Sequence, residues 1–271
     1  MRPFVRFLRN GWRRLRFRAW IVRARLELRR CGGRLRIEAP HGAGFDSSPA
    51  IKSIPEGAGS GTLTLRIGRD VWLGRKMTIE VWARGDNVLA IGDRTRFLDG
   101  VRIALRSGAV RFGPDCLIRD GVWIKSDGDL VAGDEVTLSH HSAVHCTGRI
   151  ELEDLVGIGD RACVLDSDHN FDGSDEHYMS RPVQVSPVRI GRNTMVAVGA
   201  VVLRGARIDR NSVVSSNAVV RAGEYPRGSV LSGNPAEVLK VLSSDSGDSQ
   251  QPDALSPSQP GAGRPSRAGS P

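Results

Sequence analysis

Aliphatic residues recur every six positions along the chain from Ile67 to about Val220. The pattern is uninterrupted over residues 190–220, which read IGRNTM, VAVGAV, VLRGAR, IDRNSV, VSSNAV and V. An aliphatic residue opens each hexad, and a small residue or Val stands four places later. Gly, Asn, Asp or a basic residue fills the positions between them. A short fixed period of this kind indicates a solenoid.

The hexads predict an all-β chain wound into a parallel β-helix, in which opening aliphatics line the interior and Gly and Asn turn the corners. Three hexads make a coil, and seven coils open at Ile67, Ile91, Phe112, Ala132, Leu152, Ile190 and Ile208. The spacings are 24, 21, 20, 20, 38 and 18 residues, whereas a bare coil has 18. The long spacing predicts an excursion loop between Val164 and Ile190, and strands at ~4.8 Å give the seven coils a height of roughly 34 Å.

The segments outside the hexads predict a division of the chain into four parts. Residues 1–36 form a basic helical arm, and residues 37–64, with three prolines and a Gly/Ser cluster, form an irregular connector. Residues 65–241 form the β-helix, and residues 242–271, rich in Ser, Pro, Gly and Gln, form a disordered tail.

Residues 4–29 predict an amphipathic helix because apolar residues recur every three or four places. The predicted apolar stripe contains Phe4, Leu8, Trp12, Leu15, Ala19, Val22 and Leu26. Residues 1–36 hold thirteen Arg and one acid, Glu27, a charge of +12, which leaves −3 for the rest of a chain whose net charge is +9. Two interpretations stay open: a helix on an anionic membrane surface, or a cap on the end of the solenoid. Nucleic-acid binding is less favoured, because no nucleic-acid module follows.

Cysteine usage and hydropathy favour a cytoplasmic protein, with the inner face of the cell membrane as a second location if the helix binds lipid. The four cysteines form no CxxC pair and no evident disulfide framework. No apolar run approaches the ~18 residues needed to span a bilayer. Arginines interrupt the N-terminal apolar stretch, so we expect no signal peptide.

The hexads, the segment Asp166-Ser-Asp-His-Asn-Phe171 and the ending Ser232-Gly-Asn-Pro-Ala-Glu-Val-Leu-Lys240 together resemble the hexapeptide-repeat acyltransferases. The resemblance covers about residues 65–241 and is strongest to the maltose/galactoside acetyltransferase and polysaccharide O-acetyltransferase branch. It implies a left-handed β-helix, a homotrimer with sites between subunits, and acetyl-CoA or another acyl-CoA as the acyl donor. We expect no metal. The implied acceptor is a hydroxyl of a sugar or polysaccharide precursor.

Acyl transfer from a thioester to a hydroxyl needs a base, donors for the oxyanion and two positioned substrates. Histidine suits the role of base because its ordinary pKa, ~6.5, lies near working pH. His169 stands five residues after the hexad opener Val164, where the similar acetyltransferases place their catalytic histidine. Asp166 and Asp168 are close enough in sequence for one of them to orient the ring.

The segment one coil earlier, Ser139-His-His-Ser-Ala-Val-His-Cys146, supplies candidate acceptor-binding residues. Ser139 matches the position at which the similar sugar acetyltransferases carry an acceptor-binding Asn. His140, His141 and His145 either line the same cleft or are solvated groups on the coil exterior.

The resemblance places CoA against the coils that follow the loop. Small residues there would let a pantetheine arm approach the backbone, and cations near the C-terminal end would meet the phosphates. The candidates are Gly199, Ala200, Ser216, Ala218, Arg221, Arg227 and Lys240. Two positions depart from the family: Met195 stands where a Trp is common, and Glu237 stands where a basic residue is common.

Two alternative functions stay open. In zinc hydratases of the gamma carbonic anhydrase type, two histidines five residues apart bind the metal, as His140 and His145 are spaced here. The third ligand position of that family holds Lys125, whose ammonium group cannot bind zinc. The second alternative is a β-helix scaffold without catalytic activity.

Overall fold

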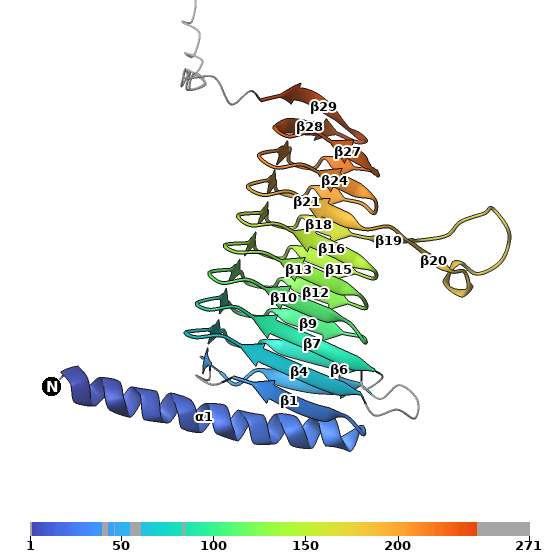
Figure 1. Cartoon of the computed structure of the whole chain (residues 1–271). Helices are drawn as coiled ribbons and strands as arrows, with labels where there is room; N and C mark the ends of the chain where they lie inside the picture. The colour runs from blue at the N-terminus through green and yellow to red at the C-terminus, as the bar shows by residue number, and fades with distance from the viewer. Residues whose placement is uncertain (1, 40–42, 46, 55–60, 83–84, 243–271) are drawn as a thin grey trace, which may run out of the picture.

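A computed structural model describes residues 2–39, 43–45, 47–54, 61–82 and 85–242, with side chains from residue 15 onward. A single N-terminal helix, α1 (Arg2–Arg30), lies across the base of a tall stack of β-coils, and one arm projects from the side of the stack (Figure 1). Three long sheets run along the stack, and each complete coil has one strand in each of them.

The strands of each sheet follow one another in sequence order, because every coil stacks on the one before it. The first sheet contains β1 (Arg34–Glu38), β4 (Thr62–Ile67), β7 (Asp86–Ile91), β10 (Ala109–Phe112), β13 (Asp129–Ala132), β16 (Arg149–Leu152), β21 (Val188–Ile190), β24 (Ala206–Ile208) and β27 (Gly223–Tyr225). The second contains β2 (Gly44–Phe45), β5 (Trp72–Leu73), β8 (Arg96–Phe97), β11 (Leu117–Ile118), β14 (Thr137–Leu138), β17 (Gly157–Ile158), β22 (Met195–Val196), β25 (Val213–Val214), β28 (Ser229–Gly233) and β29 (Ala236–Val241). The third contains β3 (Ala50–Ile54), β6 (Thr78–Trp82), β9 (Arg102–Leu105), β12 (Trp123–Ser126), β15 (Ala143–Cys146), β18 (Cys163–Leu165), β23 (Val201–Val202) and β26 (Val219–Val220).

The predicted parallel β-helix is confirmed, and so is the position of its seven coils. All seven predicted opening residues close strands of the first sheet and pair directly with one another from coil to coil, as Ile67 does with Ile91 and Leu152 with Ile190. The aliphatic columns behind this register are buried, and Ile118 and Ile124 have no exposed surface. The left hand of the coil stays an expectation from the resemblance.

An eighth coil lies below the seven predicted ones, so the connector predicted over residues 37–64 is wrong as an irregular segment. That segment contains β2, β3 and the ends of β1 and β4. β1 pairs with β4 in parallel, from Arg34 with Thr62 to Glu38 with Arg66. The hexad pattern is missing here. A segment beside a stack can still form a strand, because the backbone edge of the neighbouring strand offers hydrogen-bond partners whatever the side chains are.

In each of the seven predicted coils, two corners use a residue in the left-handed region. Asp115, Glu135, Asn193 and Asn211 are examples after the first sheet, with φ between 56° and 59°. Gly113 precedes such a corner, and a Cβ placed on it would lie 2.4 Å from the Asp134 carboxylate and 2.7 Å from the backbone of the next coil. The column of glycines in the hexads therefore reflects a close approach of stacked backbones.

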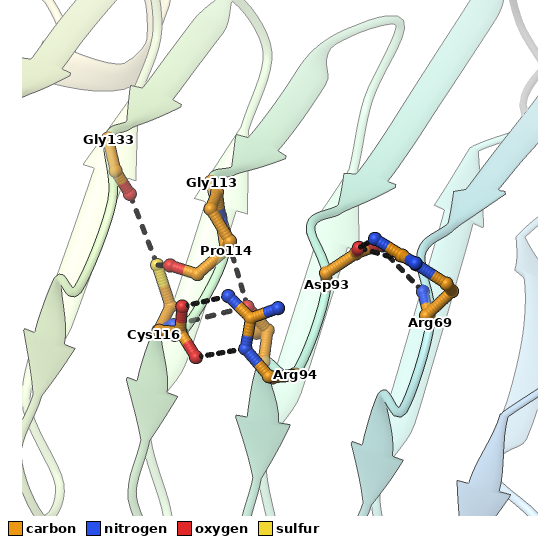
Figure 2. A network of polar contacts seen from close by, with 9 residues as sticks. Arg69, Asp93, Arg94, Gly113, Pro114, Cys116 and Gly133 are labelled. Carbon is orange, nitrogen blue, oxygen red and sulfur yellow. Dashed lines mark hydrogen bonds and ion pairs between the residues drawn. The ribbon is translucent and has the colours of Figure 1, made fainter.

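Carboxylates of one coil bind the corner of the preceding coil (Figure 2). Asp93 accepts hydrogen bonds from the backbone N–H of Arg69 at 2.8 Å and from its Nε at 2.9 Å. The backbone donor of Arg69, followed by its side chain, holds the pKa of Asp93 below the ordinary value. One coil on, Asp115 accepts hydrogen bonds from the guanidinium of Arg94 alone, and this side chain lowers the pKa of Asp115.

The helix packs on the base of the stack with apolar residues that lie outside the predicted stripe. Phe17, Trp20, Ala24 and Leu28, here called the inner stripe, are buried. The indole N–H of Trp20 donates to the backbone carbonyl of Pro49 at 2.8 Å. The described residues of the predicted apolar stripe, here called the outer stripe, are exposed: Leu15, Ala19, Val22 and Leu26. The predicted residues Phe4, Leu8 and Trp12 lie outside the described side chains.

A hairpin closes the other end of the stack. β29 runs antiparallel to β28 and is the edge strand of the second sheet. The tail predicted to be disordered lies, from residue 243 onward, outside the described residues.

Candidate functional site

The predicted excursion loop is confirmed as a long arm that leaves the stack after β18 and returns at β21 (Figure 1). Its root is a two-stranded antiparallel ribbon of β19 (Ser167–His169) and β20 (Val183–Val185). Its far part contains the 3-10 helix η1 (Tyr178–Ser180). The arm therefore presents the end of β19 away from the core of the stack.

His169 is the last residue of β19, opposite Val183, and its side chain is exposed. The imidazole meets the ring of Tyr178 edge to face, with centroids 5.2 Å apart. Tyr178 stacks in turn on Phe171 and on His177. The backbone of His169 belongs to the β19–β20 ladder, but its imidazole has no hydrogen-bond partner among the described residues, so both ring nitrogens are open to a substrate.

Arg181 organises the far part of the arm, and sequence reasoning did not single it out. It is 7% exposed, although residues 171–180 around it are all exposed. Its guanidinium donates to the carbonyls of Ser174 at 2.9 Å and Glu176 at 2.8 Å, and it pairs with Asp172 at 2.7 Å. An arginine inside a polar loop with few apolar residues is the signal that could have indicated this role.

Asp166 lies at the root of the arm and is completely buried. Its carboxylate accepts hydrogen bonds from the backbone N–H groups of Thr147 and Gly148, each at 2.7 Å. Its backbone carbonyl accepts from Ser186 N–H at 2.9 Å, where the chain returns to the stack. Asp166 therefore joins the two ends of the arm to the coil below, and its described contacts do not include His169.

Asp168 also has a partner other than His169. Its Oδ2 accepts from Nε of Arg204 at 2.7 Å, and Arg204 donates to Gln184 of β20 at 2.7 Å. Gln184 donates to Asn170 at 3.0 Å. This chain of contacts ties both strands of the ribbon to the stack. Within one protein chain, Asp166 and Asp168 therefore bind groups other than the imidazole. Their predicted role in orienting His169 stays a prediction.

Three of the predicted acceptor-binding residues lie on the edge of the third sheet opposite the arm. Ser139, His140 and His141 form the corner between the second and third sheets, whereas the arm leaves from the corner after the third sheet. The four residues of β15 separate the two edges, which corresponds to roughly 13 Å. One chain therefore does not bring His169 together with Ser139, His140 and His141.

The corner histidines have different surroundings. His140 Nδ1 lies 3.3 Å from Asp120 Oδ2, and its backbone N–H donates to Asp160 at 3.1 Å. His141 is exposed and adopts φ of 57°, so it is also a turn residue. Ser139 is half-buried, and its backbone N–H donates to Ile158 at 2.8 Å.

His145 lies between the two edges, on the outer face of β15. It meets Trp123 of β12 edge to face at 4.3 Å, and the guanidinium of Arg102 lies 5.4 Å from the centre of the indole. Its Nε2 is buried without a partner among the described groups. Burial, followed by the charge of Lys125, lowers the pKa of His145, so the ring is neutral near pH 7. Trp123, an aromatic at an outward position in a chain with few aromatics, is the residue that sequence reasoning missed here.

Four of the predicted CoA residues, Gly199, Ala200, Ser216 and Ala218, occupy the same corner as Ser139, on the coils above the arm. Ala200 and Ala218 point inward and are buried, so only their backbones could meet a ligand. Gly199 has φ of 68°, and a Cβ there would lie 2.4 Å from Asn217 Oδ1. Ser216 is exposed on the next coil, and Arg221 and Lys240 are exposed near the closing hairpin.

The described ranges contain no group of three or more His, Cys, Asp or Glu side chains placed to hold a metal ion. In the same ranges, no helix has the length and apolar character needed to cross a bilayer.

Comparisons with known proteins give local matches in sequence and a broader match in fold. The chain is 38% identical over 114 residues to the probable acetyltransferase Rv3034c of Mycobacterium tuberculosis, which covers 42% of this chain and 38% of that protein. It is 34% identical over 62 residues to a 2,3,4,5-tetrahydropyridine-2,6-dicarboxylate N-acetyltransferase of Staphylococcus aureus, covering 23% of this chain and 26% of that protein. The chain thus spans less than half the length of these relatives.

The crystal structure of the polySia-specific acetyltransferase NeuO matches with a TM-score of 0.55 and 13% identity, over 80% of this chain and 92% of that one. No protein-family model matches the chain. NeuO shows the likeness of fold, and the relatives show local likeness of sequence. The chain is therefore similar to these acetyltransferases over part of its sequence, and similar to NeuO in fold.

Proposed function

We propose that the protein transfers an acetyl group from acetyl-CoA to a hydroxyl of a sugar or polysaccharide precursor, with His169 as the general base. One observation carries the proposal: the arm presents an exposed imidazole that has no hydrogen-bond partner among the described residues. The likeness to a probable acetyltransferase supports the reaction class. The fold of a polySia-specific acetyltransferase supports a glycan acceptor.

In this reaction the acceptor oxygen attacks the thioester carbonyl carbon while a ring nitrogen of His169 takes the hydroxyl proton. Collapse of the tetrahedral intermediate breaks the carbon–sulfur bond, and the imidazolium returns the proton to the departing thiolate of CoA. The edge-to-face contact with Tyr178 would restrict rotation of the imidazole without occupying a ring nitrogen. Tyr178 could therefore orient the ring although Asp166 and Asp168 bind other groups.

A complete site would form between two chains of a homotrimer. Within one chain, His169 and the corner of Ser139 and Gly199 lie on opposite edges of the third sheet. In a symmetric ring, each chain would offer its arm to the corner of its neighbour. The pantetheine arm of CoA would lie along Gly199, Ala200, Ser216 and Ala218, and Arg221 and Lys240 would meet its phosphates.

We also propose a cytoplasmic location beside lipid-linked acceptors. The four cysteines are free, which suits a reducing compartment. The charge of the first 36 residues, +12, suits the anionic inner face of a membrane.

The test is thiol release from acetyl-CoA in the presence of a panel of sugars and amino sugars. His169→Ala should lower kcat by at least ~100-fold, the low end of general-base contributions. Because the side chain is exposed, the melting temperature should not change. Asp175→Ala, at another exposed polar residue of the same arm, is the control and should retain activity within about threefold. Near-normal kcat in folded His169→Ala would remove this residue from the mechanism.

A further inference from the structure

The outer stripe of α1 is an apolar surface that the fold leaves uncovered. Leu15 is 61% exposed, and Val22 and Leu26 are each 55% exposed. These residues lie about half a turn away from the inner stripe that packs on β1, β2 and β3. The helix therefore has two apolar faces, of which the cap uses one.

Arginines border the outer stripe on both sides. At about 100° per residue, Arg18, Arg25 and Arg29 flank one side and Arg23 and Arg30 the other. All five are exposed. The single acid of the helix, Glu27, lies away from the stripe and pairs with Arg30 at 3.2 Å. An apolar stripe between two rows of arginines is the pattern of a helix that lies in a lipid interface.

We infer that the outer stripe docks on an anionic lipid bilayer, with the arginines among the head groups. A second copy of the chain does not fit, because two faces of this kind would bring ten arginines together without compensating acids. A nucleic acid would use the arginines but would leave the leucines and valine against a polar backbone. An anionic bilayer complements both the charge and the apolar side chains.

Docking in this way sets the orientation of the protein on the membrane. The inner stripe packs against the first coil, so the outer stripe faces away from the stack, at its base (Figure 1). The stack then stands upright on the bilayer. Five strand spacings separate β3 from β18, at ~4.8 Å each, and the helix adds about 10 Å, which places the root of the arm roughly 35 Å above the lipid.

This height restricts the acceptor, a conclusion that rests on the proposed function. A head-group layer is only about 5–8 Å thick, so the arm does not reach an ordinary lipid head group. A glycan of several sugars attached to a lipid would span the distance. The geometry therefore favours the outer part of a lipid-linked oligosaccharide or polysaccharide over a short lipid-linked sugar.

The experiment is co-sedimentation of the full chain with phosphatidylcholine vesicles that contain or lack phosphatidylserine. We expect binding only to the anionic vesicles and a steep loss with salt. The triple variant Leu15→Glu, Val22→Glu, Leu26→Glu should lower the bound fraction at least about tenfold. The matched control Val238→Glu, Leu239→Glu, Val241→Glu makes the same charge change at exposed positions on the other end of the stack and should bind like wild type.

The outcomes separate docking from the proposed function. Equal vesicle binding by wild type and the helix triple variant would overturn the inference, as would a change of oligomeric state in that variant, since a second copy would then cover the stripe. Arg18→Gln, Arg25→Gln, Arg29→Gln keeps the apolar residues, and it should lose the dependence on phosphatidylserine. The helix triple variant should keep activity on soluble sugars but lose preference for vesicle-bound long glycans. If no variant and no wild-type protein showed transferase activity, the proposed function would be refuted, but the inference of membrane docking would not.

Discussion

The stack and the arm are held together by different means. Each strand inside the stack pairs with two neighbours, and the aliphatic columns between the sheets are fully buried. In the arm, by contrast, residues 171–180 are all exposed, and order depends on Arg181 and on the Asp168–Arg204 contact. Because the stack repeats the same contacts in every coil, the loss of one contact should have little effect on its structure. The conformation of the segment that carries His169 depends on a few charged contacts. A candidate catalytic residue on a less redundant segment fits the general division between a rigid scaffold and the loops that carry binding or catalytic residues.

The largest effect on stability should come from a cavity in the stack. Ile124→Ala removes a side chain with no exposed surface, and we expect a loss of about 2–5 kcal/mol in the free energy of unfolding. Phe171→Ala, a larger truncation in the arm at a residue that is 73% exposed, should cost less than about 0.5 kcal/mol. Denaturant titration measures both. Similar losses would show that the arm contributes to the core as much as a coil does.

An intermediate and local effect should follow from removal of Arg181. Arg181→Gln deletes the charged hydrogen bonds to Ser174, Glu176 and Asp172, each typically worth about 1.5–3 kcal/mol. The arm should open more often, so limited proteolysis within residues 170–182 should be roughly tenfold faster, without a change in the melting temperature of the stack.

The control for that experiment is Arg189→Gln, which removes an exposed arginine of β21 that pairs with Glu153. It should leave cleavage of the arm unchanged. Equal cleavage rates in wild type and Arg181→Gln would mean that the buried guanidinium does not organise the arm.

The smallest effect should be the response of the corner carboxylates to acid. The pKa values of Asp93, Asp99 and Asp115 are lowered by bonds from arginine side chains and backbone N–H groups. The unfolded chain therefore binds protons at a higher pH than the folded chain, so this stabilisation is present above about pH 4 and is lost as pH falls further. Urea midpoints at pH 5 and pH 3 should differ less in Asp93→Asn and in Arg69→Gln than in wild type. An identical difference in all three proteins would exclude the Arg69–Asp93 contact as a source of acid sensitivity.

The positions at which successive coils begin could be predicted from the sequence. Three hexads make one coil, so residues that open equivalent hexads stack at the same point of each coil. Ile67, Leu152 and Ile208 could be assigned to one column before any contact was known. The first coil could not, since β1 and β3 have no hexad register and form strands by pairing with β4 and β6. A free backbone edge imposes a strand on such residues, and that edge is not visible in their own side chains.

The helix shows the limit of periodicity in another way. The outer and inner stripes both recur at helical spacing, so the pattern identified a helix but not which apolar face packs on the stack. The buried face includes Trp20, whose hydrogen bond to Pro49 joins residues that are distant in sequence. The two interpretations of the helix are compatible, because the cap uses one face and leaves the other for a membrane.

The candidate site also has features that the sequence predicts and features that it does not. The position of His169 at the root of a long excursion could be predicted from the break in the hexads, but the partners of Asp166 and Asp168 could not, because Thr147 and Arg204 belong to other coils. By itself the sequence determined the coil, its register and the place where the chain leaves it, since these depend on a short local repeat. Only the tertiary structure decided which helix face packs, which carboxylates are already engaged and which edges of the third sheet the site residues occupy. Those depend on contacts between segments that no local period relates.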